Sequence, residues 1–287
     1  MNVKQLEAIP VWDWPEDANQ TLLGHLKDKQ SDQSDRLIAV ELAGEFAVMN
    51  DDLAEELLSI ACHAQETQDI RARAVISFGP VLDFIYSEGF DDPEDVPISE
   101  PVFQKIQEAL HTLYQDMDNP KQVRRRVMEA SIRAPQDWHH QAIQEAYASQ
   151  DEDWKLTAVF CMRYLQGFDH EIREALKSKN KDIHYEAVLA AGNWQVEGSW
   201  LHIREILEDT DTDKELLLAT IEAASNYENE DVAEHLYALT DSDDEDIVET
   251  AYEALAIVGE PMDLEELDDY DFGEDEDEDD DEDDMPF

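Results

Sequence analysis

Hydrophobic and polar residues follow a helical period along most of the chain, from residue 16 to residue 259. Apolar residues return every three or four positions, which places them on one side of an α-helix. Residues 181–194 show this clearly, because a polar start is followed by small and apolar residues up to Gly192. Alternating β-branched runs and Asn-Gly or Asp-Gly pairs, which indicate hairpins, are absent from the sequence. The pattern therefore predicts an all-α protein.

The same helical pattern recurs along the chain, each time with a polar anchor near its start and a small residue five positions later. The anchors are Ser34, Asp69, Gln122, Asp153, Asp182, Lys214 and Asp246. The small residues are Ala39, Ala74, Val127, Ala158, Ala187, Ala219 and Ala251. Another amphipathic segment of roughly a dozen residues precedes each copy. This predicts about seven antiparallel helix pairs, which must stack because one pair cannot bury its apolar faces alone.

One interval, between Asp69 and Gln122, is longer than the others by about 20 residues. Three prolines in residues 89–101 predict an irregular acidic loop near residues 87–101. Loops that leave a regular scaffold often carry binding residues. The candidates for protein binding here are Asp91, Asp92, Glu94 and Asp95. A plain linker that covers the groove between repeats is an equally good interpretation.

The two ends of the chain differ from the repeats. Residues 11–15 form a short aromatic segment, and residues 1–15 are predicted to cap the apolar end of the first repeat, with a docking site as the alternative. Residues 260–287 include eleven consecutive acidic residues, 274–284, which repel one another and predict a disordered tail. The expected organisation is a cap at 1–15, a solenoid at 16–259 and a tail at 260–287.

The chain is strongly acidic, with 73 acidic and 20 basic residues and a formal net charge of -53. Residues 260–287 hold 18 of the acidic residues and no Lys or Arg, so the remainder of the chain is acidic by itself. Such a surface repels phosphate, which argues against nucleic acid and anionic membranes as partners. It attracts a basic protein partner. Solubility, or adaptation to a salty cytoplasm, is the alternative explanation of the charge.

Cys62 and Cys161 are the only cysteines, and both lie in apolar helical patterns, which predicts two reduced, buried thiols. The start of the chain lacks an apolar run of signal-peptide length, and no 18 consecutive apolar residues occur. These features predict a cytoplasmic protein, which we expect to be a monomer.

The repeated motif resembles the second helix of HEAT repeats. It occurs as Asp69-Ile70-Arg71 with Ala74 and Gly79, as Gln122-Val123-Arg124 with Val127, and as Asp182-Ile183-His184 with Ala187 and Gly192. The short spacing is most similar to the HEAT-like units named from bacterial phycobilisome lyases. The resemblance implies an α-solenoid with a right-handed superhelix and, since HEAT proteins are mostly scaffolds, a role in protein interaction.

Four residues on the repeats are further candidates for protein binding. Arg124 belongs to a group with Arg125, Arg126 and Arg133, of which one is expected to pair with the acidic loop; a small anion-binding patch is the alternative. Trp154 and Trp194 are expected to pack between repeats, or to form an aromatic patch for a partner helix or a flat chromophore. His184 stands where other repeats have a basic residue.

The sequence contains no motif of a common enzyme. Phosphate-binding Gly-x-x-x-x-Gly-Lys loops and Gly-x-Ser-x-Gly elbows are absent. Deoxyhypusine hydroxylases, a HEAT-repeat enzyme family, bind metal through several His-Glu pairs, but this chain has one, His170-Glu171. His139 and His140 are neighbours, so their side chains diverge on a helix. We therefore predict no catalytic residues, no cofactor and no metal.

The leading hypothesis is a non-enzymatic protein–protein interaction scaffold that binds a basic or amphipathic protein partner through the groove of the solenoid. Two alternatives stay open at this point. One is a lyase-like or metal-dependent enzyme that uses the groove as a pocket. The other is an acidic inhibitor, or a nucleic-acid mimic, of a basic protein.

Overall fold

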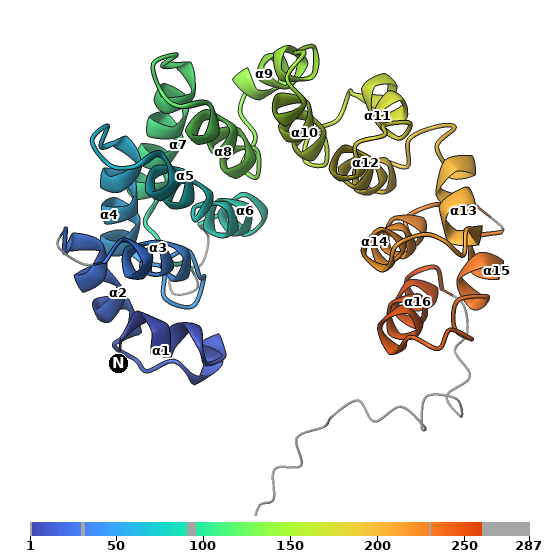
Figure 1. Ribbon diagram of the computed structural model, residues 1–287, viewed down its shortest axis with the longest axis horizontal. Coiled ribbons are helices and arrows are strands. Elements are labelled where there is room, and N and C mark those ends of the chain that lie inside the picture. The colour runs from blue at the N-terminus through green and yellow to red at the C-terminus, as the bar shows by residue number, and fades with distance from the viewer. Residues whose placement is uncertain (1, 30–31, 91–95, 230, 260–287) are drawn as a thin grey trace, which may run out of the picture. The chain divides into compact units, whose positions relative to one another are not determined.

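The computed structural model describes residues 2–29, 32–90, 96–229 and 231–259, which form helices joined by turns, with no β-strand among them (Figure 1). The predicted all-α class is confirmed. The chain divides into two compact units, Met1–Ile203 and Arg204–Phe287, with the boundary inside helix α13 (Trp200–Glu208).

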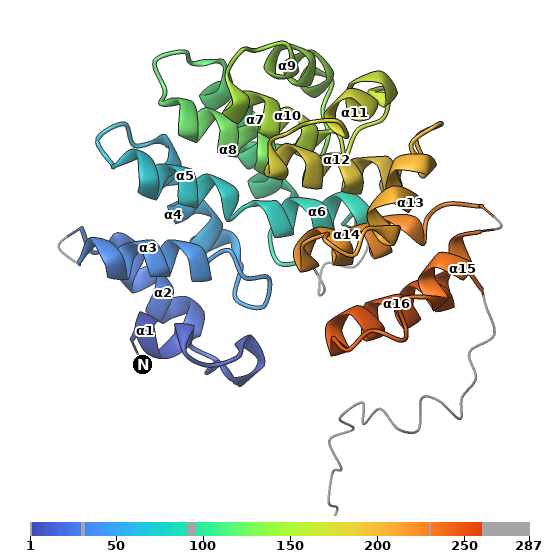
Figure 2. The same cartoon turned by 45° about the vertical axis from the view of Figure 1, so that its right-hand side comes forward.

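Helices of the first unit follow one another as pairs. The first helices are α2 (Ala18–Lys27), α4 (Asp51–Cys62), α7 (Glu100–Gln115), α9 (Trp138–Tyr147) and α11 (Asp169–Ala175). The second helices are α3 (Gln33–Leu42), α5 (Gln68–Ile76), α8 (Lys121–Ser131), α10 (Glu152–Cys161) and α12 (Lys181–Asn193). The two helices of a pair contact each other, and each second helix contacts the next second helix. Figures 1 and 2 show the resulting two layers, one of first helices and one of second helices.

The second unit continues the order of elements. After α13 come α14 (Lys214–Ala224), α15 (Val232–Tyr237) and α16 (Glu245–Ile257). Helix α15 packs against α16, and α14 also packs against α16. All seven predicted anchors fall in the first turn of a second helix, so the sequence repeat corresponds to the helix pairs.

The small residue of each repeat lies in the core. All seven of these residues are 3% exposed or less. Neighbouring backbones approach closely at Gly44, where an added Cβ would lie 2.8 Å from Ser77 Cβ and 2.9 Å from Ser77 O. Such contacts leave no room for a side chain, because real Cβ atoms essentially never come so close. The repeat thus places small residues where helices of adjacent pairs meet.

Side-chain caps begin most of the second helices. Within the described residues, six of the seven are capped by Asp, Asn or Thr, and the exception is α8, which follows Pro120. The side-chain amide of Asn180 makes hydrogen bonds to two helix pairs. Its Oδ1 accepts hydrogen bonds from the backbone N–H groups of Asp182 (3.1 Å) and Ile183 (3.4 Å), and its Nδ2 donates to Glu152 Oε2 at 3.0 Å.

Replacement of Asn180 with alanine is expected to lower the free energy of unfolding by about 1–2 kcal/mol, because an N-cap and a bond to the preceding second helix are lost together. Urea denaturation followed by circular dichroism measures the change. Ser99→Ala is the matched control, since Ser99 is the N-cap of α7 but makes no capping hydrogen bond. Equal losses in the two variants would contradict the capping role.

The longer interval between the second and third anchors contains an additional helix. Helix α6 (Gly79–Glu88) begins directly after α5 and packs against α8, whereas the sequence pattern assigned the extra length to a loop. Pro80 occupies the first turn of α6, and its buried residues include Val81, Leu82 and Ile85. Irregular backbone follows from residue 96 to Ser99. The predicted binding residues Asp91, Asp92, Glu94 and Asp95 lie outside the described residues.

The N-terminal segment contains helix α1 (Val3–Glu7) and a short 3-10 helix, Val11–Asp13. Helix α1 packs against α2 and α3. Trp14 holds the segment together, because its Nε1 donates hydrogen bonds to Leu6 O (3.0 Å) and Ile9 O (3.2 Å). The neighbouring Trp12 is 85% exposed. The predicted disordered tail, residues 260–287, lies outside the described part of the chain.

The two thiols differ in their surroundings. Cys161 is buried in α10, and this burial raises the pKa of its thiol well above the ordinary value. Cys62 is exposed, so the prediction of two buried thiols was wrong for this residue. It is the last residue of α4 and follows Ala61, which is buried. None of the helices in the described residues is both long and apolar enough to cross a membrane.

Candidate protein-binding site

In the first two repeats, the basic residue two positions after the anchor joins its helix pair to the next one. Both Nη atoms of Arg36 donate to the Glu66 carboxylate, at 3.0 and 2.9 Å. Arg71 Nε donates to Ala61 O at 2.9 Å, and its Nη2 donates to Asn119 Oδ1 at 2.6 Å. Glu66 and Asn119 occupy the same place, three positions before the anchor of the following repeat. These two arginines therefore join adjacent repeats through their Nη atoms, and we call this contact the arginine clasp.

Arg124 occupies the equivalent position in the third repeat, but its hydrogen bond reaches only the first helix of its own pair. Its Nε donates to Tyr114 O at 2.8 Å, as Arg71 does to Ala61. The residue three positions before the next anchor is Gln150, and no hydrogen bond joins it to Arg124. Among the described residues, the Nη atoms of Arg124 have no protein hydrogen-bond partner.

Two aromatic rings hold the Arg124 guanidinium instead. Its central carbon lies 5.1 Å from the centroid of the Tyr114 ring and 5.4 Å from that of the Trp154 ring. Such distances give a cation–π attraction to each ring. Tyr114 is itself fixed by a stacking contact with Trp138 at 4.9 Å between ring centroids. The two rings and the bond from Nε to Tyr114 O therefore hold the arginine side chain in one orientation.

These residues surround a pocket of about 170 Å³, which we call the Arg124 pocket. It is lined by Tyr114, Arg124, Glu145, Ala146, Ser149 and Trp154. Burial raises the pKa of the Tyr114 hydroxyl above its ordinary value, so this ring stays neutral. The structure thus brings two predicted binding residues, Arg124 and Trp154, to one pocket. Tyr114 and Glu145 come from first helices, whose registers the repeat motif did not define.

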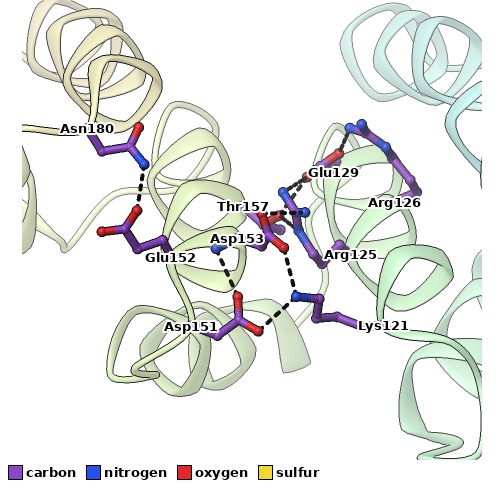
Figure 3. Close-up of polar contacts among 9 residues, drawn as sticks. All are labelled: Lys121, Arg125, Arg126, Glu129, Asp151, Glu152, Asp153, Thr157 and Asn180. Atoms are coloured by element: carbon purple, nitrogen blue, oxygen red, sulfur yellow. Dashed lines mark hydrogen bonds and ion pairs between the residues drawn. The ribbon is translucent and has the colours of Figure 1, made fainter.

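A buried carboxylate connects α8 with α10. Glu129 is 5% exposed, and its Oε1 accepts a hydrogen bond of 2.6 Å from Thr157 Oγ1 (Figure 3). Arg126 pairs with the other oxygen, and Arg125 Nε donates to Thr157 Oγ1 at 2.9 Å. These bonds neutralise a charge that would otherwise be costly to bury. Arg125 and Arg126 therefore pair within α8 and with α10.

Lysine residues at the start of second helices join neighbouring repeats. Lys121 Nζ lies 2.8 Å from Asp151 Oδ2 and 2.7 Å from Asp153 Oδ2, as Figure 3 shows. Lys214 contacts Asp244 and Asp246 in the same way in the second unit. Each lysine neutralises the acidic first turn of the next second helix. This pairing keeps these carboxylates from repelling one another.

A group of aromatic and arginine side chains lies at the C-terminal ends of α8 and α10; it consists of Arg133, Phe160, Arg163 and Tyr164, and we call it the aromatic–arginine cluster. The guanidinium carbons of Arg133 and Arg163 lie 5.4 and 5.8 Å from the centroid of the Tyr164 ring. Phe160 and Tyr164 are 5.6 Å apart. All four side chains are partly exposed.

Carboxylates hold the two arginines of this cluster. Arg133 pairs with Asp83 of α6 at 3.6 Å, and Arg163 with Glu186 of α12 at 3.1 Å. Burial raises the pKa of the Glu186 carboxyl, an effect that Arg163 opposes. The Nε atoms of both arginines are buried and have no hydrogen-bond partner. The cluster thus connects α6, α8, α10 and α12 on the side of the second helices.

The two other predicted binding residues lie at the ends of α12, and neither lines the Arg124 pocket. His184 Nε2 is 2.8 Å from Nε2 of His202 in α13. Trp194 Nε1 donates to Met162 O at 2.6 Å, which joins the end of α12 to the end of α10. These contacts join α12 to its neighbours α13 and α10, as expected for packing between repeats, which is the first of the two interpretations given for the tryptophans.

In the described residues, no group of three or more His, Cys, Asp or Glu side chains could hold a metal ion.

Comparison with known proteins supports the repeat assignment. Residues 170–256 match the family model described as HEAT repeats. No curated protein matches the sequence significantly. Three solved structures that are similar have low identity. They are YibA of Escherichia coli (18% identity, TM-score 0.46, 84% of this chain and 82% of that one), human deoxyhypusine hydroxylase in complex with glycerol (14%, 0.39, 89% and 88%), and a designed armadillo repeat protein (16%, 0.33, 84% and 99%). The match assigns residues 170–256 to HEAT repeats, and the described helices before them follow the same order of first and second helices.

Proposed function

We propose that this protein is a non-enzymatic interaction scaffold whose first unit binds an amphipathic or basic segment of another protein. The aromatic–arginine cluster is the observation that carries the proposal. Phe160, Tyr164, Arg133 and Arg163 present partly exposed side chains on the layer of second helices. Aromatic residues and arginine are the types enriched at the centres of protein interfaces.

Each component of the cluster contributes a different part of the binding energy. Covering the exposed parts of Phe160 and Tyr164 with an apolar side chain removes apolar area from water and supplies affinity. Arg133 and Arg163 are already oriented by the Tyr164 ring and by their carboxylate partners, so little side-chain entropy is lost on binding. The net charge of -53 accelerates the approach of a basic segment.

A phage-displayed library of random 12-residue peptides, panned against the purified protein, tests this function. We expect enrichment of peptides that combine apolar residues with Lys or Arg. The double variant Phe160→Ala/Tyr164→Ala should weaken binding of the enriched peptides at least tenfold, since truncation of central aromatic anchors costs about 2 kcal/mol or more. Fluorescence anisotropy with the labelled peptides measures the change.

Tyr86→Ala is the matched control, because Tyr86 is 61% exposed on α6 but does not belong to the cluster. Failure to enrich any peptide would contradict the function, and equal losses in the control and the double variant would contradict the assigned surface. Salt provides a separate check on the charge argument. Binding that is unchanged at about 1 M salt, where the Debye length is about 3 Å, would rule out an electrostatic contribution.

A further inference from the structure

We propose that the Arg124 pocket is a second contact point for the bound segment and takes a side-chain carboxylate, Asp or Glu, that lies beside a Lys or Arg. The inference rests on the proposed function, since it specifies a feature of the same partner. It locates the contact outside the aromatic–arginine cluster, at the turns that join first and second helices. The binding groups are the guanidinium of Arg124, the ring of Trp154 and the carboxylate of Glu145.

The arginine at the equivalent position makes different contacts in different repeats. Arg36 and Arg71 use their Nη atoms on Glu66 and Asn119, which forms the arginine clasp to the next repeat. Arg124 keeps the bond from Nε to a first-helix carbonyl but leaves its Nη atoms without a protein partner in the described residues. The N–H groups that join repeats one and two to their neighbours are therefore available to a ligand in the third repeat.

The geometry of the arginine selects the ligand. Two Nη atoms of one guanidinium form a planar fork that matches the two oxygens of a carboxylate. The bond from Nε to Tyr114 O and the rings of Tyr114 and Trp154 hold the fork in place before binding. A volume of about 170 Å³ accommodates one side chain of the size of Asp or Glu, and the aromatic rings cover its methylene groups.

Glu145 adds the second requirement. Its side chain is exposed and lines the same pocket, where it accepts a hydrogen bond of 2.7 Å from Gln141. An isolated carboxylate entering the pocket would be repelled by Glu145, but a neighbouring Lys or Arg on the ligand removes this repulsion by pairing with it. The same charge disfavours a phosphate dianion. The pocket therefore fits a segment with adjacent charges of opposite sign.

Panning of the same peptide library against matched variants tests the inference. The wild-type protein is expected to enrich peptides with Asp or Glu beside Lys or Arg, and Arg124→Ala should lose this enrichment while still enriching apolar residues. Individual enriched peptides should bind Arg124→Ala at least tenfold more weakly. Arg124→Lys, which keeps the charge without the fork, should lose most of the preference. Glu145→Gln should keep the preference for a carboxylate and lose that for the adjacent basic residue.

The outcomes separate this inference from the proposed function. If peptides are enriched through Phe160 and Tyr164 but are equally rich in Asp and Glu with wild type and Arg124→Ala, the pocket assignment is wrong and the scaffold function stands. If the wild type enriches no peptide, both are wrong. Glu145→Gln changes an exposed residue, so its result does not depend on a loss of folding. Equal preferences in wild type and Glu145→Gln would also overturn the assignment of opposite charges.

Discussion

Replacement of Glu129 with glutamine is expected to lower the free energy of unfolding by about 3 kcal/mol. The carboxylate is 5% exposed, and it binds Thr157 Oγ1 at 2.6 Å as well as Arg126. Arg125, whose side chain is 15% exposed, lies 3.8 Å from it. Removing the negative charge leaves Arg126 without its carboxylate partner and Arg125 with Asp153 alone, 3.4 Å away, and removal of one partner is the costly way to break a buried ion pair. Urea denaturation at neutral pH measures the loss.

Glu41→Gln is the matched control, because Glu41 occupies the same position as Glu129, seven residues after the anchor, in the first repeat. It pairs with Arg73 at 3.2 Å, but the two side chains are 57% and 46% exposed. An exposed pair of this kind contributes about 0–1 kcal/mol. Similar losses for Glu41→Gln and Glu129→Gln would show that burial does not set the value of these pairs.

The repeat made much of the fold predictable. One motif with a period of about 30 residues fixed the registers of all seven second helices, because each anchor begins a helix and each small residue enters the core. Helix α6 was not predicted, since it lies outside the repeated motif and the prolines that follow it indicated a loop. The short apolar run of α6 becomes helical through packing against α8.

Only the part of the candidate site that lies on second helices could be predicted, because the motif covers those helices alone. Arg124 and Trp154 were found because they sit at defined positions of the motif, and packing of α8 against α10 brings them together. Glu145 lies on a first helix, where no motif was recognised. The three adjacent arginines looked like one patch, but a helix turns about 100° per residue and gives each a different neighbour. Arg124 contacts Tyr114, whereas Arg125 and Arg126 contact Glu129.

His139 is expected to make the protein less stable as the pH falls from 7 to 5. Its side chain is 0% exposed, and burial lowers its pKa from 6.5 to about 4. The backbone N–H of Gln136 donates to Nδ1 at 2.8 Å, so Nε2 carries the proton and donates to Ser131 Oγ at 2.9 Å. Ser131 Oγ in turn donates to Val127 O at 2.6 Å. The hydrogen bonds of this ring are thus those of the neutral form.

The sign of the pH dependence follows from the lowered pKa. Between pH 6.5 and 4 the unfolded chain binds a proton at His139 that the folded chain does not bind. The stabilisation is therefore complete above pH 6.5 and is lost as the pH falls toward 4, which amounts to about 2 kcal/mol between pH 7 and pH 5. The free energy of unfolding of His139→Gln should therefore fall by about 2 kcal/mol less than that of the wild type between pH 7 and pH 5. Urea denaturation at the two pH values measures both differences.

His170→Gln separates this effect from the titration of the many carboxylates. The His170 side chain is 74% exposed, so its replacement should leave the pH dependence of wild type unchanged. Both variants keep every Asp and Glu, and the difference between them isolates the buried imidazole. Titration of the His139 ring by NMR gives the same answer directly, because a pKa near 6.5 in the folded protein would contradict the neutral hydrogen-bonded ring. Such a value would also remove the reason for any difference between His139→Gln and His170→Gln.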